Sequence, residues 1–139
     1  MRKLLVNRIV LDASAVLAMI LAEPGGEIVD ALLDSIESNP EVQVAISSVN
    51  WCEILTRMQR EKLGMSTMRL TSVLAGVDLF PFGKNEAEDA AGYASVNRAL
   101  SLGDRACLAL AKSLGATAWT AEQLWARCKL DVPLKLIRT

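Results

Sequence analysis

The chain has 139 residues, which is enough for one domain with a substantial hydrophobic core. It contains no histidine, which excludes Ser–His and Cys–His nucleophile systems and zinc sites built on imidazole. Its 15 basic and 16 acidic residues give a net charge of −1, so the composition alone argues against a strongly basic nucleic-acid-binding protein.

The N-terminus begins like a signal peptide, with MRK before a run of apolar residues. Asn7, Arg8 and Asp12 interrupt that run, and the segment Ala13–Ala22 is too short to span a bilayer. We therefore expect a cytoplasmic protein with no membrane segment. Three widely separated cysteines, which form no CxxC pair, are expected to be buried free thiols: Cys52, Cys107 and Cys128.

Apolar periodicity predicts alternating strands and helices along the first half of the chain. The expected elements are a strand, two helices and a second strand: Arg8–Leu11, Ala13–Leu21, Glu27–Ile36 and Val42–Ile46. Ser47 and Ser48 are suited to cap a third helix, and Gly64 is expected to end it. One face of that helix carries an apolar stripe, which is formed by Trp51, Ile54, Leu55 and Met58.

The second half continues the alternation. The next expected elements are a helix from Ser66 to about Ala75, the strand Val77–Phe80 and a helix from Glu86 to about Leu100, which Asn85 caps. A further helix is expected to begin at Asp104 and to end at Gly115. The last expected elements are the strand Ala116–Thr120, the helical turn Leu124–Cys128 and the strand Leu134–Ile137. This order predicts an α/β fold with a mostly parallel central sheet and helices on both faces. In such folds the site lies outside the carboxyl ends of the strands.

Four carboxylates are expected near those strand ends. Asp12 follows the first strand, and Glu122 follows the strand Ala116–Thr120. Asp104 begins the helix that feeds this strand, and Glu53 comes from the helix after the second strand. If the four face one cleft, their repulsion has to be relieved by raised pKa values or by bound cations. Oxygen ligands without histidine or cysteine suit Mg²⁺ or Mn²⁺.

Each acid also has a structural interpretation. Asp12 could cap the helix that follows the first strand. Asp104 and Glu122 could be acids favoured at helix N-termini. Glu53 could form an ion pair with Arg57 one turn later. The functional interpretation therefore depends on the four acids as a set.

Three stretches resemble the PIN-domain ribonucleases, in particular the VapC-type toxins of bacterial toxin–antitoxin pairs: IVLDASAVLAMILAEPG, AISSVNWCEILTRM and LSLGDRACLALAKSLGATAWTAE. The resemblance runs over nearly the whole chain and implies a single PIN-like nuclease domain over residues 1–139. The third stretch is the most specific. It combines a glycine, Asp104 and Arg105 on a small-residue helix with a strand that ends in Thr-Ala-acid.

The resemblance implies a metal-dependent endoribonuclease that uses Mg²⁺ or Mn²⁺. Asp12, Glu53 and Asp104 match the acidic metal-site residues of the family. Ser14 matches the hydroxyl two residues after the first acid, and Thr120 matches the hydroxyl before the last one. A metal-activated water is expected to hydrolyse the RNA phosphodiester bond, with these hydroxyls orienting water, ligand or phosphate.

The fourth acid departs from the family. Glu122 stands where an Asp is most frequent, and Gln123 where a basic residue is often found. Without the four site acids, the net charge of −1 becomes +3, which permits weak, salt-dependent RNA binding. The candidate phosphate contacts are Arg57, Arg98 and Arg105.

The resemblance also implies an antitoxin protein that docks near the cleft. Hydrophobic residues make up 52% of the chain, which agrees with such a partner and with a homodimer.

Two other classes of protein are alternatives. A phosphate-transferring α/β domain could use Asp12 as a nucleophile, but dehalogenase-like phosphatases need a second Asp where this chain has Ser14. A receiver domain needs an acid after the third strand, and Phe80, Pro81 and Phe82 supply none. A catalytically weak PIN-like module that binds metal, RNA or protein is the other alternative, and Glu122 is the feature that favours it.

Overall fold

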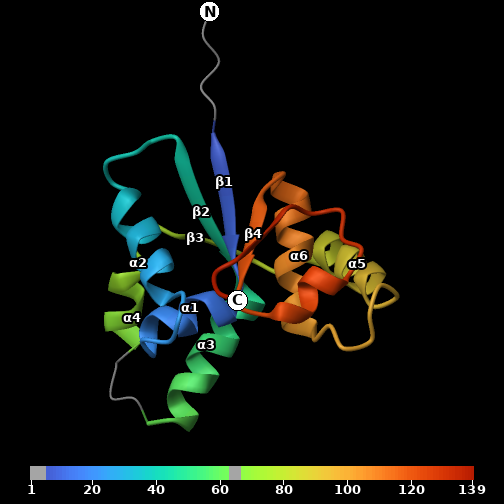
Figure 1. The fold of residues 1–139 in the computed structure, drawn as a ribbon, viewed down its shortest axis with the longest axis horizontal. Coiled ribbons are helices and arrows are strands. Elements are labelled where there is room, and N and C mark those ends of the chain that lie inside the picture. The colour runs from blue at the N-terminus through green and yellow to red at the C-terminus, as the bar shows by residue number, and fades with distance from the viewer. Residues whose placement is uncertain (1–5, 63–66) are drawn as a thin grey trace, which may run out of the picture.

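An entirely parallel sheet of five strands runs through the centre of the described part of the protein (Figure 1). The computed structural model describes residues 6–62 and 67–139. The strands are β1 Asn7–Leu11, β2 Val42–Ser47, β3 Asp78–Phe80, β4 Thr117–Thr120 and β5 Leu134–Leu136. They are arranged in the order β3-β2-β1-β4-β5.

Helices cover both faces of this sheet, which confirms the predicted α/β architecture. The helices are α1 Ala13–Ile20, α2 Gly26–Ser35, α3 Ser48–Arg60, α4 Thr67–Val73, α5 Lys84–Tyr93, α6 Leu102–Leu114 and the 3₁₀-helix η1 Gln123–Arg127. Figure 1 shows α1 to α4 on one side of the sheet and α5 and α6 on the other. No helix within the described ranges combines the length and apolar character that a membrane span requires.

The central strand β1 contributes to two hydrophobic cores. Ile9 and Leu11 point to the core beneath α1 to α4, whereas Val10 points to the core beneath α5 and α6. All three side chains are at most 3% exposed. Burial on both faces explains why the last three residues of β1 are all apolar instead of alternating with polar ones.

The strand order of the sheet reverses at β1, which is its topological switch point. From β1 it passes to β2 on one side, and it later returns to β4 on the other side of β1. The backbone amide of Asp12 donates to the carbonyl of Trp119 at 2.9 Å, so the ends of β1 and β4 lie side by side. Such a switch point is where open α/β sheets bind ligands.

Local signals set several helix ends as predicted. The side chain of Ser47 caps α3 by accepting a hydrogen bond from the amide of Val49 at 3.2 Å. Gly115 ends α6 in the left-handed conformation, with φ of 61°.

The prediction for α5 was wrong at both ends. Gly83 is the N-cap, Asn85 lies inside the helix, and the helix ends at Tyr93 instead of about Leu100. The Asn97 side chain accepts from the amide of Ala99 at 2.9 Å, and this local turn competes with helix formation.

The cysteine prediction was only partly right. All three thiols are free, but only Cys107 is buried, while Cys128 is half-buried and Cys52 is exposed. The predicted helix stop at Gly64 and helix start at Ser66 lie outside the described residues.

Candidate active site

A cleft of about 630 Å³ opens beside the switch point, at the carboxyl ends of β1 and β4. All four predicted acids line it, together with Ser14: Asp12 after β1, Glu53 from α3, Asp104 from α6 and Glu122 after β4. Thr120 is fully buried and contacts Asp12 directly. The fold therefore brings together every site residue that the sequence predicted.

Two hydroxyl groups hold the carboxylate of Asp12. Its Oδ2 atom accepts from Ser14 Oγ at 2.6 Å and from Thr120 Oγ1 at 2.9 Å. Backbone amides of Ala121 and Glu122 donate to these two hydroxyl oxygens at 3.0 Å each, which leaves the hydroxyl protons for Asp12. The Asp12 side chain makes no capping hydrogen bond to α1, so the structural interpretation of this acid fails.

Burial raises the pKa of Asp12 from 3.8 to about 7. Desolvation is the largest cause, and the negative charges of Asp104 and Glu53 act in the same direction. The hydrogen bonds from Ser14 and Thr120 oppose the shift without cancelling it. Without a bound cation, the protonated form of Asp12, the most buried of the four acids, is therefore favoured.

This raised pKa predicts how the stability of the metal-free protein depends on pH. Between pH 3.8 and about 7 the folded protein keeps the Asp12 proton while the unfolded chain releases it. The free energy of unfolding should therefore fall as pH rises, by up to about 1.4 kcal/mol per pH unit from this group. Denaturant titrations in EDTA at pH 5 and pH 7.5 measure the fall. Asp12→Asn should show a much smaller decrease in the free energy of unfolding between these two pH values. Equal decreases in the two proteins would contradict the prediction.

Glu53 is held by a residue that the sequence analysis missed. Asn50, one turn earlier on α3, donates its Nδ2 to Glu53 Oε1 at 2.9 Å and to the carbonyl of Gly103 at 3.0 Å. Partial desolvation raises the pKa of Glu53, with Asp104 and Glu122 adding to the shift. Arg57 pairs with Glu61 and not with Glu53, so the ion-pair interpretation of Glu53 fails.

A sequence signal for Asn50 existed. Asn50, Ile54 and Met58 follow one another at intervals of four on α3, and all three are buried. A polar residue in such a buried stripe needs hydrogen-bond partners, and those of Asn50 are the site residues.

Asp104 starts α6 and also faces the cleft. Its Oδ2 accepts from the amide of Ser101 at 2.9 Å, while Ser101 Oγ accepts from the amide of Asp104 at 3.1 Å. This capping box starts α6 and fixes its first turn. The same carboxylate lines the cleft and raises the pKa of Asp12 and of Glu53.

Glu122 is exposed at the cleft, where it occupies the N-cap position of η1 without a capping hydrogen bond from its side chain. Its charge contributes to the raised pKa of Glu53, so it is electrostatically part of the cluster.

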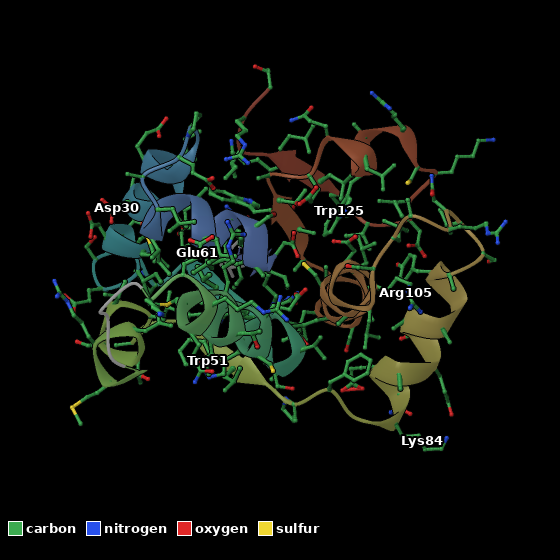
Figure 2. All side chains as sticks on the ribbon, turned by 90° about the horizontal axis from the view of Figure 1, so that it is seen from below. Asp30, Trp51, Glu61, Lys84, Arg105 and Trp125 are labelled. Atoms are coloured by element: carbon green, nitrogen blue, oxygen red, sulfur yellow. The ribbon has the colours of Figure 1, made fainter. Side chains whose placement is uncertain are left out.

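The arginines are arranged differently from the prediction. Arg57 lines the cleft, whereas Arg98 and Arg105 do not. Figure 2 shows Arg105 on the side of α6 that faces α5, where it donates to the carbonyl of Ala90 at 3.3 Å. Two arginines that were not singled out from the sequence, Arg60 and Arg138, line the cleft instead.

The donor set fits a hard divalent cation. None of the four acids takes part in an ion pair within residues 6–62 and 67–139, although three arginines line the same cleft. No three acidic or cysteine side chains in these ranges converge closely enough to hold one ion as they stand. Hydrogen bonds from the Ser101 amide and the Asn50 side chain hold Asp104 and Glu53 in these positions. The residues therefore fit Mg²⁺ or Mn²⁺ in their chemistry, and a cation would draw them together.

The profile of the PIN domain family matches residues 9–128. No curated protein sequence matches the chain.

Several solved structures share the fold. VapBC-1 from nontypeable Haemophilus influenzae has a TM-score of 0.65 at 12% identity, covering 94% of this chain and 98% of that chain. VapBC2 from Rickettsia felis, bound to a DNA fragment from its promoter, has a TM-score of 0.62 at 14% identity, covering 92% of this chain and 97% of that chain. FitAcB from Neisseria gonorrhoeae has a TM-score of 0.59 at 23% identity, covering 91% of this chain and 95% of that chain.

Proposed function

Because the chain belongs to the PIN domain family, we propose that it is a Mg²⁺- or Mn²⁺-dependent endoribonuclease and the toxin of a toxin–antitoxin pair. The observation that carries the proposal is one cleft lined by four carboxylates from four separate parts of the chain, none of which forms an ion pair within the described residues. Such a cluster is costly for a protein that binds no cation.

Each site residue has a proposed role. Asp12, Glu53 and Asp104 would hold the ion, and Glu122 would be a fourth, weaker ligand. Ser14 and Thr120 fix the rotamer of Asp12, since both donate to one of its oxygens. When bound, the ion supplies a hydroxide nucleophile at neutral pH and neutralises charge that develops on the phosphoryl oxygens.

Arginines at the cleft support RNA as the substrate. Arg57, Arg60 and Arg138 line the same cleft as the acids. Arg57 and Arg138 are paired with glutamates, whereas Arg60 has no carboxylate at ion-pair distance in the described part of the chain. We assign Arg60 as a phosphate contact next to the proposed metal site.

An antitoxin is the proposed protein partner. Leu102, two residues before Asp104, is 52% exposed and offers an apolar contact near the cleft. The solved relatives include VapBC2 from Rickettsia felis and a toxin–antitoxin complex from Klebsiella pneumoniae, which supports this assignment. A homodimer is also proposed, because Trp51, Leu74 and Leu79 line a separate apolar hollow. The exposed free thiol of Cys52 fits a cytoplasmic location.

The second candidate is a catalytically weak PIN-like module that binds metal, RNA or protein. The exposed Glu122, with its longer side chain, is the observation that favours it.

Cleavage of a mixed RNA substrate by the purified protein distinguishes the two candidates. We expect cleavage with Mg²⁺ or Mn²⁺ and none with EDTA, with activity restored when the metal is returned. A wild-type protein that neither cleaves RNA nor binds Mn²⁺ would favour the binding module.

Glu122→Ala should reduce cleavage by no more than about 10-fold, since an outer ligand contributes less than an inner one. Single-turnover cleavage rates measure the loss. Glu37→Ala removes an exposed glutamate that does not line the cleft and is the matched control, with an unchanged rate expected. A loss for Glu122→Ala as large as that for Asp12→Asn would make Glu122 a full ligand.

A further inference from the structure

The side-chain amide of Asn50 joins three parts of the cleft. Asn50 is fully buried, and its Nδ2 lies 2.9 Å from Glu53 Oε1, 3.0 Å from the carbonyl oxygen of Gly103 and 3.4 Å from Asp12 Oδ1. An amide nitrogen has two protons, so the two short distances are its hydrogen bonds and Asp12 receives a longer, weaker contact. The side chain therefore ties α3 to the first turn of α6, next to the end of β1.

The acceptors around Asn50 determine which way its amide points. If the amide group were turned by 180°, its oxygen would face the carboxylates of Glu53 and Asp12 and the carbonyl of Gly103. All of these groups are hydrogen-bond acceptors, so no hydrogen bond could form. In the observed orientation Asn50 Oδ1 is buried and has no hydrogen-bond partner within the described residues. A buried acceptor without a donor lowers stability. A leucine of similar size would avoid that loss, so packing alone does not explain an amide at this position.

We propose that Asn50 is a positioning residue, which sets the spacing between the carboxylates of α3 and α6. Asp104 directly follows Gly103, so the bond from Asn50 to the Gly103 carbonyl fixes the turn that carries Asp104. The second bond from the same nitrogen fixes Glu53. One amide thus holds both carboxylates in register, while Ser14 and Thr120 hold Asp12. This inference rests on the proposed metal-dependent function.

Asn50→Leu keeps the volume of the side chain and removes both donors. We expect its affinity for Mn²⁺, measured by titration calorimetry, to fall by at least about 10-fold, as for other residues that orient metal ligands. Its thermal unfolding midpoint in EDTA should equal or exceed that of the wild type, because the unpaired Oδ1 is removed as well. Asn50→Ser, which retains one donor, should have an intermediate affinity and serves as a second variant if Asn50→Leu does not fold.

Ser47→Ala is the matched control, because it removes the N-cap of the same helix without touching the acids. It should lower the unfolding midpoint and leave the Mn²⁺ affinity unchanged. Equal affinity in the wild type and both Asn50 variants would overturn the positioning role while the proposed function stands. Affinity losses that follow the unfolding midpoint across all the variants would overturn it too. A wild type that binds no Mn²⁺ would overturn the proposed function and this inference together.

Discussion

Asp12→Asn is expected to lower RNA cleavage by at least about 1,000-fold, because the loss of a direct ligand removes several kcal/mol of transition-state stabilisation. Asp12 is the acid that the fold holds most firmly, since both Ser14 and Thr120 donate to it and it is only 3% exposed. Asparagine retains one oxygen for those hydroxyls but supplies no negative charge. Single-turnover cleavage with saturating Mn²⁺ measures the effect.

The same substitution should leave the fold intact. It removes a buried carboxylate whose pKa is raised to about 7, so the metal-free variant should be at least as stable as the wild type at pH 8. Asp30→Asn, on the exposed surface of α2, makes the same chemical change away from the cleft (Figure 2) and should cleave like the wild type. Normal cleavage by a natively folded Asp12→Asn would show that the carboxylate cluster is not the catalytic site.

Gly103→Ala is expected to reduce cleavage by about 100-fold or more with little change in stability. A Cβ atom on Gly103 would lie 2.2 Å from Glu53 Oε1, and its three nearest neighbours would all be atoms of that carboxylate. The end of a flexible side chain can move, so the helix should form normally while Glu53 is displaced from its position beside Asn50. Displacement of a catalytic group by about 1 Å is enough for a loss of this size.

Gly92→Ala is the matched control for this experiment. Gly92 lies in α5, and a Cβ atom there would meet no atom within 4 Å. Alanine should raise the stability of that helix by roughly 0.5–1 kcal/mol and leave cleavage unchanged. Neither variant should therefore unfold at a lower temperature than the wild type, while their cleavage rates should differ strongly. Similar rates would mean that the position of Glu53 does not matter for catalysis.

The places of the strand ends and helix caps around the site could be predicted from the sequence. Asp12 and Thr120 are separated by 108 positions, yet both end apolar runs, and parallel strands bring such ends to one edge of a sheet. Ser47 and Gly115 marked helix ends correctly because capping depends on a few neighbouring atoms.

The failures have a common physical cause, since each depends on which way a side chain points after packing. Arg105 follows Asp104 in sequence but points to α5, whereas Arg60 reaches the cleft from α3. Asn50 has a role only because the first turn of α6 packs against α3. The segment after the early end of α5 contains a turn in which Asn97 accepts from the amide of Ala99, and apolar periodicity does not detect such a local hydrogen bond.

The central claim is that the four carboxylates form one site for a divalent cation, and anomalous diffraction from crystals grown with Mn²⁺ tests it most directly. We expect a manganese peak in the cleft, with oxygens of Asp12, Glu53 and Asp104 at about 2.0–2.3 Å, as hard cations require. Glu53 and Asp104 should also move closer together than in the metal-free protein. Crystals without a peak in this cleft, or with manganese bound only at other positions, would contradict it.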